Sequence, residues 1–443
     1  MAYDDRESDE AVKPSERSES PESSVDVAPG ERRRRFLGLE RNVVAAGVVS
    51  FFMDISSEMV YPLVPLFLSA VLGVNKSLIG LIEGIAETTA SLLKLASGWY
   101  SDRIGRRKAL MGAGYGISAL SRIGLAAAGT WGQVLGVRFV DRVGKGVRTA
   151  PRDAIVADSS SGHDLGRNFG FHRMMDQMGA VIGPGVAFLV LSLRPGDYRT
   201  VFWLSFIPGV LAVLAVVLFV RERRRPGRRA SGPRAAGRVA ADGSGRTGAA
   251  PPRWSRRALG GPLFAYLGVT GLFALGNSSD AFLILRAQDV GVTAALIPLV
   301  YLAFNLVYSG FSVPAGLMAD RFGRKRLLVV GYLLFSGTYA GLALARQPAH
   351  IWALFILYGV YMGFADGTGR ALLAQLAPAE RRATAFGAYH AVVGVAALPA
   401  SATAGLLWDR VSPAAPFWLG AGTALVAAVL LAVTVRPAAH ATA

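Results

Sequence analysis

Long apolar stretches separated by short polar segments run through most of the chain. Twelve of them lie near residues 43–70, 78–100, 109–129, 132–152, 168–193 and 198–220, then 261–287, 292–319, 327–346, 350–375, 383–408 and 413–435. A helix needs about 20 apolar residues to cross the hydrocarbon of a bilayer. Several stretches contain Gly or Pro, which membrane helices tolerate because neighbouring helices satisfy the interrupted backbone. The pattern predicts an all-α membrane protein with twelve transmembrane helices.

The polar segments divide the chain into parts. Residues 1–40 are largely polar, acidic and Ser-rich toward their start, which predicts a disordered cytoplasmic tail. Residues 221–258 are rich in Arg, Gly, Ala and Pro, a composition that predicts a flexible basic linker. We therefore expect six-helix bundles at 41–220 and 259–436, and a short tail at 437–443.

Basic residues near the helix ends predict the topology, because cytoplasmic loops carry an excess of Lys and Arg. If the helices alternate in direction, the basic loops after the second, fourth, eighth and tenth helices fall on the same side as the linker. The opposite loops hold only scattered cations. We expect a multi-pass protein of the bacterial cytoplasmic membrane with both termini in the cytoplasm.

Three segments recur about half a chain later. GWYSDRIGRRK at 98–108 recurs as GLMADRFGRKR at 316–326, SSE at 56–58 as SSD at 278–280, and FGFH at 169–172 resembles FGAYH at 386–390. The three pairs keep their order, which indicates a duplication. Parallel repeats of six helices are a known arrangement in transporters, so we expect two pseudo-symmetric bundles.

The 98–108 and 316–326 segments resemble the loop signature of the major facilitator superfamily, and the resemblance extends over residues 40–435. It implies the twelve-helix fold of that family and a gating role for the loops, in which Asp102 and Asp320 help close the cytoplasmic side. The expected gating residues are Gly98, Asp102, Arg103, Gly105 and Arg106, with Gly316, Asp320, Arg321, Gly323 and Arg324 in the second copy. The alternative is a basic loop that only sets topology.

Two further segments resemble motifs of this family. DRVGKGVRTAPRD at 141–153 is similar to the Arg-x-x-Gln-Gly motif of the fourth helix, with Lys145 where Gln is usual, and the resemblance implies a part for Arg142 in proton coupling. Gly170, Gly179, Gly183 and Pro184 match the spacing of the antiporter motif of the fifth helix, although its final Gly pair is absent. Small residues at these intervals also serve ordinary close packing of helices.

Composition excludes several classes of function. Only 17 % of residues are charged, against about 25 % in typical soluble domains. The net charge of +17 lies in short clusters between apolar stretches, which argues against a nucleic-acid surface. There is no Cys for disulfides or thiol chemistry, and Gly144-Lys145 lacks the rest of a phosphate-binding loop. We expect no enzyme activity, no cofactor and no metal site.

Charged residues inside the apolar stretches are the candidates for mechanism, because such groups are costly in lipid and face a cavity or a partner. Asp54 and Glu58 share one face of the first helix and could meet Arg142 or Lys145, so these four are the proton-coupling candidates. The substrate-cavity candidates are Glu83, Glu87, Asp176, Asp280, Asp366, Arg370, Tyr61 and Phe304. Static ion pairs between helices are the alternative for the charges, and core or lipid contact for the aromatics.

These features together predict a secondary active transporter that works by alternating access. We expect proton-coupled export of an amphipathic small molecule such as a drug or secondary metabolite, by a monomer whose partners are substrate, protons and membrane lipids. One alternative is an importer of an organic anion or sugar phosphate that uses the cations of the pocket. The other is a membrane sensor that kept the fold and lost transport.

Overall fold

The computed structural model describes residues 35–36, 39–104, 107–159, 165–221, 261–377 and 382–435. The predicted tails lie largely outside these ranges, as does the predicted linker apart from its first residue. Gly105 and Arg106 of the first loop motif also lie outside them.

The first half begins with two short antiparallel strands, β1 (Arg35–Phe36) and β2 (Leu39–Glu40). Six helical segments follow, and the first of them is interrupted near Pro62. They are α1 (Arg41–Val60) with α2 (Val64–Leu66) and the π-helical η1 (Phe67–Val71), then α3 (Lys76–Ile104), α4 (Arg107–Ala127), α5 (Trp131–Asp158), α6 (Leu165–Leu193) and α7 (Tyr198–Phe219).

The second half repeats this arrangement in the described residues. Its first segment is broken at 277–280. The elements are α9 (Gly261–Gly276) with α10 (Ala281–Asp289), then α11 (Ile297–Phe322), α12 (Arg324–Leu344), α13 (Pro348–Leu376), α14 (Arg382–Arg410) and α15 (Ala415–Thr434). The described residues thus form twelve helical segments at the twelve predicted positions.

Eight of the helical segments in the described ranges are long and apolar enough to cross a membrane by length and composition. The other four segments are α3, α4, α5 and α11. The windows of α3 and α5 carry acids and cations, for example Glu83, Glu87 and Asp141. Intramembrane charge is therefore concentrated in two helices of the first half.

Matching side-chain contacts in the two halves reflect the sequence repeat. Lys108 at the start of α4 donates to the carbonyl of Val217 in the last turn of α7, and Lys325 at the start of α12 donates to that of Ala432 in α15. The last carbonyls of a helix lack partners within the helix and carry partial negative charge, so a cation there is favourable. The Lys of each loop motif thus ties its helix to the last helix of its own half.

The ends of α4 and α12 are closed by arginines in the same way. Arg199 donates to the carbonyls of Ala126 and Ala128 at 2.5 and 2.7 Å. Arg286, which also pairs with Asp289, donates to three carbonyls at the end of α12, those of Leu342, Ala343 and Ala345. Arg286 therefore stabilises the end of α12.

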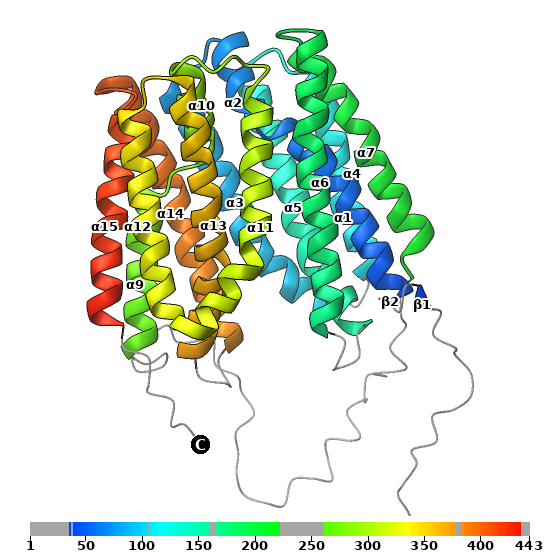
Figure 1. Ribbon diagram of the computed structural model, residues 1–443. Helices are drawn as coiled ribbons and strands as arrows, with labels where there is room; N and C mark the ends of the chain where they lie inside the picture. The colour runs from blue at the N-terminus through cyan, green and yellow to red at the C-terminus, as the bar shows by residue number, and fades with distance from the viewer. Residues whose placement is uncertain are drawn as a thin grey trace, which may run out of the picture. The chain divides into compact units, whose positions relative to one another are not determined.

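The two halves meet along α3 and α14 and along α6 and α11 (Figure 1). We call the end at which α7 finishes and α9 begins the linker end, at the bottom of Figure 1, and the other the opposite end. At the opposite end the Asp409 carboxylate of α14 accepts hydrogen bonds from the backbone N–H groups of Lys76 and Ser77, at 3.2 and 2.7 Å. An acid of one half therefore caps the N-terminus of α3 in the other half.

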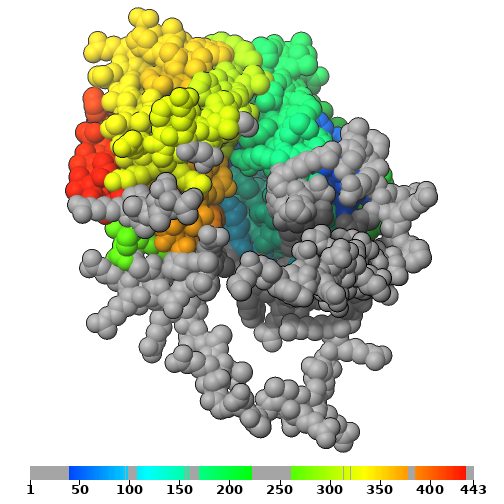
Figure 2. Space-filling view, turned by 60° about the horizontal axis from the view of Figure 1, so that its bottom comes forward, coloured from blue at the N-terminus to red at the C-terminus, as the bar shows by residue number. Residues whose placement is uncertain are grey.

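Further contacts between the halves continue toward the middle of the helices. Thr88 of α3 donates to the carbonyl of Gly394 at 2.7 Å. Asn305 of α11 donates to the carbonyl of Ala180 in α6 at 3.1 Å, and Ser309 bonds to Gln177 at 2.9 Å. Figure 2 turns the linker end toward the viewer and shows α6 and α11 on either side of a hollow, with parts of α3 and α5 deeper between them.

Candidate functional site

Asp54 and Glu58 lie one helical turn apart on α1, and both side chains are partly exposed. Neither forms an ion pair with any side chain that the structure describes. One carboxylate oxygen of Glu58, Oε2, is buried and has no hydrogen-bond partner among the described residues. Keeping a carboxylate ionised inside a membrane protein costs free energy when no cation or hydrogen-bond donor contacts it.

The helix that packs on these acids is α6, and two glycines bring it close. A β-carbon placed on Gly179 would lie 2.5 Å from the carbonyl oxygen of Phe51 and 2.9 Å from Cβ of Asp54. A β-carbon on Gly183 would lie 2.9 Å from Cβ of Glu58. All three distances are shorter than van der Waals contact allows, so the motif glycines let α6 approach α1 at the level of the two acids. Gly170 differs, because no described atom lies within 4 Å of its added β-carbon.

Three other acids of the first half each hold an arginine. Arg138 donates to both carboxylate oxygens of Glu83 at 2.7 and 2.5 Å, and both side chains are almost fully buried. Arg142 lies 3.5 Å from Glu87. These pairs join α5 to α3 and correspond to the static alternative considered for intramembrane charges.

The third pair joins α4 to α5. Arg122 lies 3.3 Å from the Asp141 carboxylate and also donates to the hydroxyl groups of Ser56 and Ser57 on α1. Sequence reasoning did not single out Arg122 or Arg138. The signal was present, since each is a cation inside a predicted membrane span and must find an acid there.

The expected contact between the α1 acids and the cations of α5 is present only as a longer-range attraction. Among the cations, Lys145 acts most strongly on the Glu58 carboxylate, and Arg142 follows. Lys145 has no ion pair with a described side chain, whereas Arg142 is held by Glu87. Arg148 stacks over the ring of Tyr115, 4.7 Å from its centroid. Glu58, Arg142 and Lys145 therefore lie in one region without a direct pair between α1 and α5, whereas the cations that act on Asp54 are Arg148 and Arg152.

Asp176 belongs to a second group of polar side chains between α1, α5 and α6. His172 lies 3.6 Å from Asp176 and hydrogen-bonds to the Ser50 hydroxyl at 2.9 Å. Arg152 donates to the same hydroxyl at 3.2 Å. Asp176 is also the charged group that acts most strongly on Asp54. The group extends the line of acids on α1 toward the linker end.

In the second half, Asp366 and Arg370 pair with each other along α13. Tyr308 of α11 donates to Asp366 at 2.7 Å, and Arg173 of α6 donates to the Tyr308 hydroxyl at 2.9 Å. The Arg173 guanidinium itself lies 3.8 Å from Asp366. These two cavity candidates thus form an ionic network between the halves, and Arg173 is a member that the sequence analysis missed.

Asp280 has a different environment. It lies in the break between α9 and α10 and accepts a hydrogen bond from the Tyr358 hydroxyl at 2.8 Å. No described cation is paired with it.

Tyr61 and Phe304 lie in a column of aromatic rings that crosses from α1 to the second half. The ring centroid of Tyr61 is 5.7 Å from that of Tyr301, which is 5.3 Å from that of Phe304. Phe304 in turn stacks on Tyr358 at 5.3 Å. Phe304 is buried and Tyr61 partly exposed. Aromatic pairs of this spacing contribute to packing, so both residues have a core role, and lining of the cavity remains a prediction.

The loop motifs join consecutive helices at the linker end. Gly98, Asp102 and Arg103 fall in the last turns of α3, and Gly316, Asp320 and Arg321 in those of α11, while Arg324 begins α12. Gly323 has φ of +91°, a backbone conformation that glycine adopts readily, and it ends α11. The side chains of Asp102 and Asp320 lie outside the described residues, so their gating role stays a prediction.

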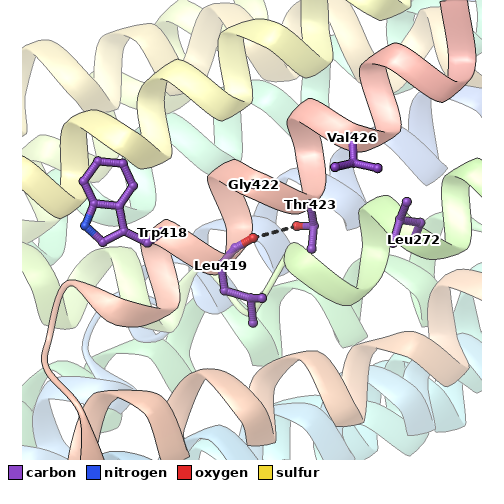
Figure 3. Close-up of a pocket in the computed structure, with 6 residues that line it drawn as sticks. All are labelled: Leu272, Trp418, Leu419, Gly422, Thr423 and Val426. Carbon is purple, nitrogen blue, oxygen red and sulfur yellow. Dashed lines mark hydrogen bonds between the residues drawn. The ribbon is translucent and has the colours of Figure 1, made fainter.

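A groove of about 350 Å³ on the outer face of the second half lies away from these charges (Figure 3). It is bordered by Leu272 of α9 and by five residues of α15, Trp418, Leu419, Gly422, Thr423 and Val426. Trp418 and Val426 are half exposed. This is an apolar crevice between two helices, without a charged group. In the described ranges, no three His, Asp or Glu residues are placed to hold a metal ion.

Two repeated six-helix halves with ionised side chains buried inside the helical bundle define a multi-pass membrane transporter. The model of the Major Facilitator Superfamily matches residues 46–285 and 267–443, and the chain belongs to this family. An uncharacterised MFS-type transporter of Methanocaldococcus jannaschii is 32 % identical over 399 residues, 89 % of this chain and 94 % of the relative. This membership confirms the predicted fold class and the prediction that the protein is a transporter and not an enzyme.

Two other similarities are more limited. A probable actinorhodin transporter of Streptomyces coelicolor is 29 % identical over 168 residues, 37 % of this chain and 28 % of the relative. The crystal structure of a D-xylose-proton symporter covers 90 % of this chain and 97 % of its own, with a TM-score of 0.68 and 17 % identity. At that identity the likeness shows the fold alone.

Proposed function

We propose that the protein is a proton-coupled exporter of an amphipathic small molecule. It works as a monomer in the bacterial cytoplasmic membrane, with both termini in the cytoplasm. The linker end is then the cytoplasmic end, which is consistent with the basic loops found there. Figure 2 shows a hollow between α6 and α11 at the linker end, while Asp409 joins the halves at the opposite end, so we assign this conformation to a cavity that faces the cytoplasm.

One observation carries the proposal: Asp54 and Glu58 have no ion pair with a described side chain, while Glu83, Glu87 and Asp141 each hold an arginine. A paired carboxylate stays ionised, because its cation stabilises the charge. An unpaired carboxylate inside the bundle is the one that gains from binding a proton. The two α1 acids are therefore the groups that we assign to proton exchange.

Coupling then follows from the position of these acids. With Glu58 charged, Lys145 and Arg142 attract it toward α5. Protonation removes that attraction, which changes the balance between two arrangements of α1 against α5. The membrane potential supplies about 2.3 kcal/mol per charge per 100 mV, enough to bias such a switch.

Export is favoured over import by the partial similarity to a probable actinorhodin transporter, and the fold itself is compatible with either direction. The importer of an organic anion needs free cations in the cavity. Arg142 and Arg370 instead carry the counter-acids Glu87 and Asp366. Lys145 and Arg148 are the cations of that alternative without an ion pair among the described side chains, and Arg148 stacks on the Tyr115 ring.

Reconstituted transport tests the proposal. Purified protein in liposomes with an acidic lumen is given external ethidium, or the uncharged drug chloramphenicol, and accumulation is followed with no other energy source. We expect the wild type to accumulate at least one probe. Asp54→Asn or Glu58→Gln, or both, abolish accumulation, whereas Asp289→Asn, an acid paired with Arg286, retains it.

Three outcomes contradict the proposal in different ways. If both α1 variants accumulate probe as the wild type does, the proton site lies elsewhere. Accumulation that requires an alkaline lumen identifies symport and an importer. Failure of the wild type to move either probe, or any drug against which its overexpression protects cells, favours the sensor.

A further inference from the structure

Asp366 lies between arginines of both halves, and one of its oxygens serves them both. Its Oδ2 atom pairs with Arg370 on the same helix, lies 3.8 Å from Arg173 of α6 and accepts the hydrogen bond of Tyr308 at 2.7 Å. Arg173 also donates to the Tyr308 hydroxyl at 2.9 Å. One carboxylate therefore faces two guanidinium groups, so one positive charge of this network is left uncompensated by it.

Two further groups that can carry positive charge adjoin this network. The charged groups that act on His390 of α14 are Lys94 of α3 and Arg370. Lys94 has no ion pair with a described side chain. The acid that acts on Lys94 most strongly, Glu87, already holds Arg142. The described acids therefore leave this region of the interior with an excess of positive charge.

The network lies between the halves and is open to solvent. Its side chains come from α3, α6, α11, α13 and α14, which belong to both halves. Those of Arg173, Arg370 and Asp366 are nevertheless 54, 45 and 33 % exposed. In Figure 2 the hollow at the linker end lies between α6 and α11, the helices that carry Arg173 and Tyr308. A solute that enters this hollow can therefore reach the arginines.

We propose that Arg173 and Arg370 bind the carboxylate of an amphipathic organic anion, the substrate of the exporter. This assignment rests on the proposed function, because it names the substrate class of that exporter. A ligand carboxylate takes the place that the Asp366 carboxylate now holds between two guanidinium groups, whose planar forks suit carboxylate oxygens. A membrane potential that is negative inside drives an anion outward, which agrees with export.

Equilibrium binding of two probes of matched shape tests the preference for an anion. Purified wild-type protein in phosphatidylcholine nanodiscs is titrated with radiolabelled diphenylacetate or its neutral amide at one neutral pH, without a gradient, and displaceable binding is measured. We expect diphenylacetate to bind at least ~10-fold more tightly than the amide. Equal or tighter binding of the amide overturns the proposal. If phosphatidylglycerol in the nanodisc displaces diphenylacetate, the site holds lipid headgroups and the substrate assignment fails.

Variants then assign the effect to the two arginines. Arg173→Gln and Arg370→Gln each weaken diphenylacetate binding ~10–100-fold, the range expected for loss of a charge-assisted contact. Arg173→Lys keeps the charge and binds more tightly than Arg173→Gln. The matched control Arg194→Gln, whose exposed arginine lies 4.0 Å from Asp197 at the opposite end, stays within about threefold of the wild type. Unchanged affinity in both Gln variants, or an equal loss in the control, refutes the site.

Asp366→Asn gives an outcome that damage to the fold cannot imitate. The Asp366 carboxylate competes with the ligand for Arg173 and Arg370, so its neutralisation should tighten diphenylacetate binding at least ~5-fold. Binding of the neutral amide should stay within about threefold of the wild type. Unchanged or weaker binding of diphenylacetate contradicts this competition and overturns the site.

The inference and the proposed function can fail separately. If chloramphenicol accumulates in liposomes with an acidic lumen and the anion is not preferred in binding, this inference alone fails. If diphenylacetate binds through Arg173 and Arg370 and no probe, diphenylacetate included, accumulates in response to the pH step, the proposed function alone fails.

Discussion

The three glycines of the α6 motif, Gly170, Gly179 and Gly183, lie in different environments. Replacing each with alanine tests whether the motif acts by letting α6 pack closely on α1. Gly183→Ala adds a β-carbon 2.8 Å from the carbonyl oxygen of Ile55, 2.9 Å from Cβ of Glu58 and 3.0 Å from the backbone nitrogen of Met59. These atoms belong to the backbone of α1 or lie next to it, so the two helices must move apart. Gly170→Ala meets no described atom within 4 Å.

The magnitude follows from two opposing contributions. Overpacking costs about 1–3 kcal/mol, and alanine in the middle of a helix is favoured over glycine by roughly 0.5–1 kcal/mol. The second contribution is common to the variants and cancels in the comparison between them. Gly183→Ala should therefore be less stable than Gly170→Ala by about 1–3 kcal/mol, with Gly179→Ala similar to Gly183→Ala. Gly170→Ala itself should equal or exceed the wild type in stability.

Thermal unfolding of the purified variants in one detergent, followed by tryptophan fluorescence, measures this order. Transport in the liposome assay is measured in parallel, because displacement of α6 also moves Asp54 and Glu58 relative to α5. Indistinguishable melting temperatures for Gly170→Ala and Gly183→Ala would refute the packing argument. Intact stability with lost transport in Gly170→Ala would instead indicate a role for the motif that close approach does not explain.

Three further changes have outcomes that the structure specifies. Glu83→Gln leaves the buried Arg138 without its acid and should lower the free energy of unfolding by about 3–5 kcal/mol. The double variant Glu83→Leu/Arg138→Met should recover much of that loss, and no recovery contradicts the pairing. Asp409→Asn weakens the cap of α3, and maleimide labelling of an introduced cysteine at Ser401, a buried residue of α14 in a chain without cysteine, should become severalfold faster. Hydrogen bonds from Thr200 in the first turn of α7 hold the pKa of Asp197 below its usual value, so the ionised acid stabilises the folded state at pH values above its unfolded pKa and less as the pH falls. Asp197→Ala should therefore melt at a lower temperature than the wild type at pH 7, and the difference should shrink near pH 3. A difference that grows in acid contradicts the cap.

The sequence was sufficient for the helices and their duplication, because a membrane span needs a minimum run of apolar residues and each half repeats the same motifs. It was also sufficient to find Asp54 and Glu58, since a charge inside such a run is conspicuous. It predicted that these acids would meet the cations of the fourth helix. In the structure Arg142 holds Glu87, and Glu58 is only attracted by Lys145 at longer range.

Tertiary structure decided which charges are neutralised. Spacing along a helix shows which residues share a face, whereas the neighbour across a helix interface depends on the rotation and depth of both helices. That is why Arg122 and Arg138 became visible as partners of Asp141 and Glu83 only in the folded chain. For the same reason Gly170 and Gly183, members of one motif, differ in what surrounds them. Local pattern fixes where polar groups enter the membrane, and packing determines whether they find a counter-charge there.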